Sequence, residues 1–280
     1  MTINFYNNFN NGDIHFSRGL INLVKKTYPN YQYNFLHKNK KGILKDMSFI
    51  NELDLNEKCA QNKGVSFYDG EIYINTWYGQ NDFIFLRQNG GCTLKTVMAI
   101  SSYIFSQLNK TINFEEETLY PTVDFKNFTV PNTTKNFKIL ICNSESLSEQ
   151  SNNVNLDHMI DVLSDLYPEI TFYVTKKTEI TKQNIIYTSD ITNITPDLLE
   201  ISYISTKCEI IVGRGSGPYS FSILLENIKD DRKTFVGLCN KYIEGIWDTR
   251  FLKCKYVHNS SGDIDNITKN LIEIIKGYGY

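Results

Sequence analysis

The 280-residue sequence predicts an α/β protein built from two domains of similar size. Short apolar runs typical of buried parallel strands alternate with amphipathic helices through the second half of the chain. The first half opens with the same succession of strand, loop and helix. A polar stretch with two prolines, residues 109–136, separates the halves. We place the domains at 1–132 and 133–280. Because open parallel sheets bind ligands at the carboxyl ends of their strands, we expect the site in a cleft where the domains face each other.

The first half begins with a strand at 3–6, a polar loop and a helix from Leu20 that ends before Pro29. Alternating aromatic residues predict a strand at 31–37. Asp69-Gly70 predicts a two-residue hairpin turn between further strands at 65–68 and 71–75. A long amphipathic helix follows at 93–108.

The second half alternates strands and helices more regularly. Thr195, Pro196 and Asp197 mark one helix start, since Thr is a good N-cap and Pro suits the first helical position. This alternation implies a parallel sheet with helices on both faces. The strands are expected at 137–142, 170–174, 185–188, 208–212, 234–238 and 255–258, and the other helices at 156–167, 218–227, 242–251 and 264–276.

Composition restricts the class of protein. Hydrophobic residues make up 41% of the chain and charged residues 21%, enough for a sizeable core. A net charge of −2 creates no global field for nucleic acid, so no nucleic-acid partner is expected. Six scattered cysteines without C-x-x-C spacing indicate reduced core residues and a cytoplasmic protein. No segment approaches the roughly 18 apolar residues of a membrane span, although peripheral membrane contact remains open.

The most informative stretch is a glycine-rich turn after the predicted strand 208–212. It consists of Gly213, Arg214, Gly215, Ser216 and Gly217, and Pro218 stands where the next helix would begin. Glycines let a ligand approach the backbone, and the start of a helix favours an anion. Arg214, Ser216 and Ser220 lie within reach of that anion. The pattern predicts a phosphate or nucleotide-sugar site, although many glycine-containing turns of this kind bind nothing.

Two further loops carry candidate residues. Asp13 and His15 lie in the first loop, where either could take a proton from a hydroxyl; alternatively, Asp13 caps the following helix and His15 is a plain loop residue. Ser144 and Glu145 follow the strand 137–142 and could hold a ribose or a sugar, or belong to a solvated loop.

No metal constellation is convincing, and no cofactor is expected. The four histidines are isolated in sequence. The Asp263-Ile264-Asp265 spacing is better explained by capping of the last helix.

Two motifs resemble heptosyltransferase-type glycosyltransferases of family 9. The first is Asn11-Gly12-Asp13 followed by Leu20, Leu23 and Pro29. The second is the segment from Ile204 to Gly215-Ser216-Gly217-Pro218, where this chain has Gly-Ser in place of the family's Asp-Thr. The resemblance implies the GT-B fold, two Rossmann-like domains facing a cleft, with the acceptor on the first domain and the sugar nucleotide on the second. By position it makes Asp13 the catalytic base, with Asn11, Gly12 and Arg18 on the acceptor side, and it places residues 215–217 against the donor.

These observations together predict a metal-independent glycosyltransferase. Asp13, or His15, would deprotonate the hydroxyl of a glycan or glycoconjugate acceptor, and the turn with Arg214 would stabilise the diphosphate that leaves the donor. The alternatives are another GT-B enzyme, such as a sugar-nucleotide epimerase, and an inactive nucleotide-sugar-binding module.

Overall fold

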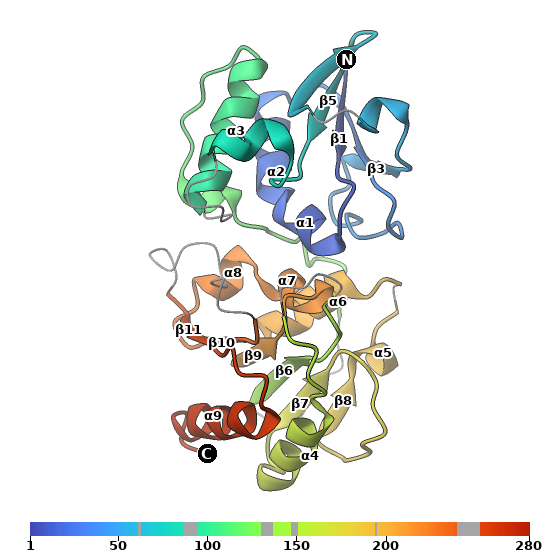
Figure 1. Cartoon of the computed structure of the whole chain (residues 1–280). Helices are drawn as coiled ribbons and strands as arrows, with labels where there is room; N and C mark the ends of the chain where they lie inside the picture. Colours follow the sequence, from blue (N-terminus) through green and yellow to red (C-terminus); the bar gives the residue numbers. More distant parts are fainter. Residues whose placement is uncertain (61–62, 87–93, 130–136, 147–150, 194, 240–252) are drawn as a thin grey trace. The chain divides into compact units, whose positions relative to one another are not determined.

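The computed structural model describes residues 1–60, 63–86, 94–129, 137–146, 151–193, 195–239 and 253–280 (Figure 1). The chain divides into two compact units, Met1–Lys126 and Asn127–Tyr280. Each unit is an α/β body with one sheet. The predicted domain junction at 132/133 and the predicted helix 242–251 lie outside the described residues.

The first unit holds a five-stranded sheet in the order β3-β2-β1-β5-β4. Its members are β1 Thr2–Tyr6, β2 Gln32–Leu36, β3 Ile50–Leu53, β4 Val65–Tyr68 and β5 Glu71–Asn75. All neighbours are parallel except the β4–β5 hairpin. Its turn has positive φ at Asp69 (50°) and Gly70 (79°), as the predicted two-residue turn requires.

The helices of the first unit are α1 Asn11–Phe16, α2 Arg18–Thr27 and α3 Leu94–Gln107, with 3-10 turns η1 Glu57–Ala60, η2 Asn81–Leu86 and η4 Glu116–Leu119. Helix α1 corrects the predicted loop: Asn10 is its N-cap residue, so Asp13 belongs to the first helical turn. Ser17 joins α1 to α2, and its hydroxyl donates to the Ile14 carbonyl at 2.7 Å. Strand β3 was not predicted, because this short edge strand is only half buried and lacks an apolar run.

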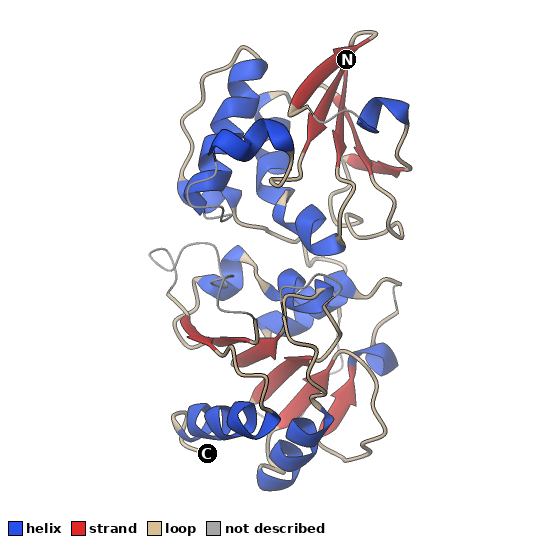
Figure 2. Cartoon of the chain, in the orientation of Figure 1, coloured by secondary structure: helices blue, strands red, loops and turns tan. Residues whose placement is uncertain are grey.

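The second unit holds a six-stranded, wholly parallel sheet in the order β11-β10-β9-β6-β7-β8. Helices α4 and α9 cover one face, and α6, α7 and α8 lie on the other (Figures 1 and 2). The bounds are β6 Lys138–Cys142, α4 Asp157–Leu166, β7 Thr171–Val174, β8 Ile185–Tyr187, α5 Thr188–Ile191, α6 Leu198–Thr206, β9 Ile210–Gly213, α7 Gly217–Ser222, α8 Leu225–Ile228, β10 Thr234–Gly237, β11 Lys255–His258 and α9 Ile264–Lys276. The predicted parallel sheet with helices on both faces is confirmed here.

The predicted helix 218–227 is split into α7 and α8. Side chains satisfy the carbonyls that the break releases: Ser202 Oγ donates to the Phe221 carbonyl at 2.7 Å, and Asn227 Nδ2 donates to the Ser222 carbonyl at 2.8 Å. These local bonds compensate for the lost helical ones, which sequence periodicity could not foresee.

Both sheets share one feature that positions ligands. In each, the chain adds strands to one side of the first strand and then crosses to its other side. The strand order therefore reverses between β1 and β5 in the first unit and between β6 and β9 in the second. Such switch points, at the carboxyl ends of the strands, are where open α/β sheets bind ligands.

Candidate functional site

Arg214 lies at the switch point of the second sheet. It directly follows β9, and Asn143 directly follows the neighbouring strand β6. The Arg214 side chain is only 3% exposed. Its Nη2 donates to the Asn143 carbonyl at 3.3 Å, and its Nη1 donates to Asn153 Oδ1 at 3.2 Å. These two loops therefore fix the guanidinium at the edge of the sheet.

The charge of Arg214 is not neutralised by the described part of the chain. No carboxylate there lies within ion-pair distance of it, and its Nε has no hydrogen-bond partner among the described residues. Burial lowers the pKa of the guanidinium, and Glu145 opposes this only partly. Because a buried cation without a counter-charge is costly, an anion that accepts from this guanidinium would be strongly favoured.

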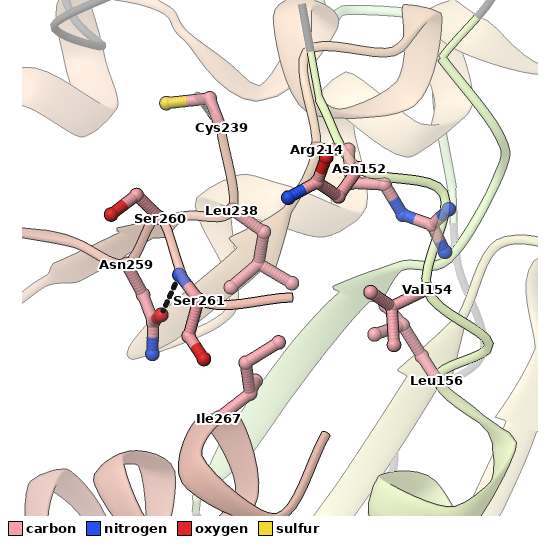
Figure 3. A pocket seen from close by; sticks show the side chains of 10 residues that line it. All are labelled: Asn152, Val154, Leu156, Arg214, Leu238, Cys239, Asn259, Ser260, Ser261 and Ile267. Atoms are coloured by element: carbon pink, nitrogen blue, oxygen red, sulfur yellow. Dashed lines mark hydrogen bonds between the residues drawn. The ribbon is translucent and has the colours of Figure 1, made fainter. Parts of the chain in front are cut away.

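A small pocket opens beside Arg214 (Figure 3). Figure 3 shows Arg214 on one side and the loop of Asn259, Ser260 and Ser261 on the other, with Leu238 between them. Asn259 Nδ2 also lacks a partner among the described residues. The enclosed space is about 10 Å³, room for roughly one water, so a larger ligand would occupy the open mouth. The lining residues are Asn152, Val154, Leu156, Arg214, Leu238, Cys239, Asn259, Ser260, Ser261 and Ile267.

Two backbone N–H groups of the glycine-rich turn are already used within the protein. The Gly215 N–H donates to Ser151 Oγ at 3.3 Å, and the Ser216 N–H donates to the Arg214 carbonyl at 2.6 Å. Gly213 is buried, and a Cβ there would lie 2.6 Å from that of Cys142. Glycine is therefore required at position 213 for packing. Its backbone conformation does not require glycine, because none of the turn's glycines has a positive φ. Anion recognition would therefore depend on side chains.

The other predicted donor residues differ in their exposure. Ser216 is buried at the N-cap of α7, and its Oγ has no hydrogen-bond partner among the described residues. Gly217, Ser220 and Ser144 are half-buried. Glu145 is exposed and forms an ion pair with Lys176 at 3.3 Å. Among these predicted residues, Ser216 is thus the buried hydroxyl without a described partner.

In the first unit, Asp13 lies beyond the carboxyl end of β1, at the third position of α1. Burial raises the pKa of its carboxyl, while hydrogen bonds from the backbone at Asn10 and at Asp13 itself partly offset this shift. The bond from Asn10 is the one that an acidic residue makes in a capping box. Asp13 therefore supports the helix start, and its raised pKa makes its carboxylate a stronger base.

Two other candidates in this region are buried. His15 is fully buried, and its ring lies edge-on to Phe16 at 5.7 Å, so a substrate hydroxyl cannot reach it. Arg18 is also fully buried and holds Asp46 through two bonds of 2.7 and 2.9 Å. We leave both residues out of the site. Asn11 and Gly12 are half-buried in the first turn of α1, beside Asp13.

Two negative findings apply to the described residues. Within the described ranges, no three His, Cys, Asp or Glu side chains gather where they could hold a metal ion. No helix in that same part of the chain is long and apolar enough to cross a membrane. Asp263 is the N-cap of α9 and accepts from the Asp265 N–H at 3.0 Å, so this Asp-x-Asp pair is a helix cap, as predicted.

Comparison with solved structures identifies the fold. The chain matches the heptosyltransferase WaaC of E. coli, solved with ADP-2-deoxy-2-fluoro heptose, with a TM-score of 0.57 at 7% identity over 100% of both chains. It matches ADP-heptose LPS heptosyltransferase II of E. coli with a TM-score of 0.56 at 12% identity, again over 100% of both chains. A family 9 glycosyl transferase of Veillonella parvula gives a TM-score of 0.54 at 11% identity, covering 96% of this chain and 88% of that one.

The chain has the fold of the family 9 glycosyltransferases. The predicted resemblance is confirmed at this level, as is the α/β fold class. No protein-family model matches the sequence, and no curated protein matches it either. At identities of 7–12% the likeness concerns the fold, so the roles of individual residues rest on the chemistry described above.

Sequence reasoning missed Asn259, Asn153 and Ser151. Asn259 directly follows β11, and a polar residue just after a buried strand is a signal that could have been used. Asn153 and Ser151 lie in the long loop after β6, and nothing local connects them to the turn 213–217, which they contact.

Proposed function

We propose that this protein is a glycosyltransferase that moves a sugar from a nucleotide-sugar donor to a hydroxyl acceptor, without a metal ion. The second unit binds the donor through its diphosphate. Arg214 is the main ligand of that diphosphate, supported by Ser216 and Asn259. The first unit carries Asp13 as the general base. The fold, shared with glycosyltransferases, supports this function over an unrelated anion-binding role.

The observation that carries the proposal is the buried Arg214 guanidinium at a switch point, with no carboxylate partner among the described residues. A diphosphate supplies the missing negative charge. As the bond between the sugar and the diphosphate breaks, further negative charge develops on the leaving oxygen. A guanidinium fixed beforehand by Asn143 and Asn153 stabilises that charge without reorganising.

Asp13 supplies the second requirement, a group that removes the acceptor proton. An acceptor hydroxyl is a weak nucleophile until a base takes its proton. Burial raises the pKa of Asp13, which strengthens its carboxylate as a base.

Donor binding is tested by isothermal titration calorimetry with ADP, UDP and GDP. Arg214→Met should weaken the binding of the preferred nucleotide by about 1.5–3 kcal/mol, the usual worth of hydrogen bonds to charged groups. Arg232→Met is the matched control, because this arginine of the same unit is exposed and pairs with Asp230. A folded Arg214→Met variant with wild-type nucleotide affinity would remove Arg214 from the site.

Transfer is tested by following the release of nucleoside diphosphate from nucleotide sugars in the presence of glycan acceptors. Asp13→Asn should lower turnover by about 10²-fold or more, and donor affinity should stay unchanged. Added EDTA should leave turnover unaffected. Nucleotide binding without transfer by the wild-type protein to any acceptor would favour the inactive binding module instead.

A further inference from the structure

Phe9 and Trp77 form a stacked aromatic pair at the switch point of the first sheet. Phe9 follows β1 and Trp77 follows β5, and these two strands are neighbours where the strand order reverses. The two rings lie face to face, with centroids 3.6 Å apart and an interplanar angle of 16°. A pair of large aromatic rings thus occupies the place where a sheet of this topology binds its ligand.

Hydrogen bonds hold Phe9 firmly. Its N–H donates to Asn7 Oδ1 at 3.0 Å, and its carbonyl accepts from Asn39 Nδ2 at 3.0 Å. Asn7 is fully buried and donates in turn to Thr76 Oγ1 at 3.3 Å, next to Trp77. The backbone on both sides of the stack is therefore fixed before any ligand arrives.

Trp77 also packs closely against Gly79. A Cβ at Gly79 would lie 2.2 Å from the indole ring, so only glycine leaves room for this ring position. Phe9 is 37% exposed and Trp77 is half-buried, so the stack is partly open to solvent.

The surroundings of this stack are polar. The indole N–H has no hydrogen-bond partner among the described residues, and the loop that holds Phe9 through Asn39 carries exposed Lys38 and Lys40. An acyl chain would need a continuous apolar groove. A pyranose ring has one face of C–H groups and a rim of hydroxyls, which match an aromatic face beside a free N–H donor.

We propose that the Phe9–Trp77 stack is the acceptor-sugar platform of this protein. The apolar face of an acceptor pyranose lies on Phe9, and one ring hydroxyl accepts from the Trp77 indole N–H. Asp13 lies four residues beyond Phe9, on α1, so a sugar on the platform has a base close by in the chain. This inference rests on the proposed function and names its acceptor class as carbohydrate.

The test uses the fluorescence of Trp77. The chain has two tryptophans, so Trp247→Phe leaves Trp77 as the only one. This variant is titrated with the methyl glycosides of glucose, galactose and mannose. At least one of them should shift the Trp77 emission, whereas glucitol, which has similar hydroxyls but no ring face, should not.

Phe9→Leu keeps the bulk of the side chain and removes the aromatic face. It should weaken glycoside binding by about three- to tenfold, as expected for the loss of one aromatic contact. Phe9→Tyr should retain binding. Phe67→Leu is the matched control, because Phe67 is 60% exposed on the β4 edge strand and should not affect glycosides. Melting temperatures identify any variant that fails to fold.

The outcomes separate the platform from the proposed function. The platform is overturned if no glycoside shifts Trp77 emission, if glucitol shifts it equally, or if folded Phe9→Leu binds glycosides as tightly as Phe9→Tyr. Glycoside binding by a protein that binds no nucleoside diphosphate would support the platform and remove the glycosyltransferase proposal. Nucleotide binding should be the same in Phe9→Leu and in wild type, because the platform belongs to the first unit.

Discussion

Replacing Arg18 by methionine should strongly destabilise the first unit. The guanidinium of Arg18 is fully buried and forms two bonds to the Asp46 carboxylate, at 2.7 and 2.9 Å, and one to the Ile43 carbonyl at 2.6 Å. The Asp46 side chain is only 2% exposed. Arg18→Met would leave this carboxylate buried without a counter-charge, which costs about 3–5 kcal/mol. That is a large share of the roughly 5–15 kcal/mol that stabilises a typical domain.

The measurement is urea unfolding followed by Trp77 fluorescence in the Trp247→Phe background, so that the signal comes from the first unit alone. The double variant Arg18→Met/Asp46→Leu should be more stable than Arg18→Met, because removing both charges leaves no isolated ion. The reasoning is refuted if Arg18→Met costs less than about 1 kcal/mol, the range of exposed ion pairs. If a stable Arg18→Met variant also lost activity, Arg18 would again be a candidate for contacting the acceptor.

Three further predictions concern single residues. Lys233→Met should cost about 2–3 kcal/mol in thermal or chemical unfolding, because the buried ammonium donates to three backbone carbonyls at and just beyond the end of α6. Gly213→Ala should cost about 1–3 kcal/mol through its clash with Cys142, whereas Gly217→Ala, with its nearest neighbour at 3.5 Å, should change little. Asp13→Asn should stabilise the folded state at neutral pH in thermal unfolding, because a raised folded-state pKa makes ionised Asp13 unfavourable; this gain should vanish as the pH falls below the carboxyl's usual value near 4.

Local patterns in the sequence predicted most of the fold. The Asp69-Gly70 turn was recognisable because only a few residue types tolerate positive φ at both positions. The buried strands of the second sheet were recognisable as continuous apolar runs, because both of their faces are covered. Strand β3 was not predicted, because a partly exposed edge strand has no continuous apolar run.

The site was predictable in position but not in detail. The turn 213–217 does lie at the carboxyl edge of its sheet, yet its glycine and arginine act differently from the expectation. Gly213 accommodates Cys142, and Arg214 turns inward to Asn143 and Asn153. These partners are about 60–70 residues away in the chain, so the local sequence carries no sign of them.

The same limit explains why the surroundings of Arg18 were not predicted. In the predicted loop, the Arg18 side chain would be available to a ligand. In the observed helices α1 and α2 it is directed toward Asp46, which lies 28 residues further along the chain. The stacking of Trp77 on Phe9 was equally hidden from the local sequence. It arises because β1 and β5 are neighbours, and that pairing depends on the whole strand order.

The distribution of charge between the two sheets agrees with the proposed chemistry. A cation within a few ångströms of a carboxylate favours its ionised form and lowers its pKa, which weakens it as a base. In this chain, Arg214 and the candidate base Asp13 belong to different sheets. Burial and backbone hydrogen bonds therefore govern the pKa of Asp13, and the net shift is upward. The charge of Arg214 is available to an anionic ligand, because no described carboxylate pairs with it. A single sheet edge carrying both groups would pair them with each other and remove both functions.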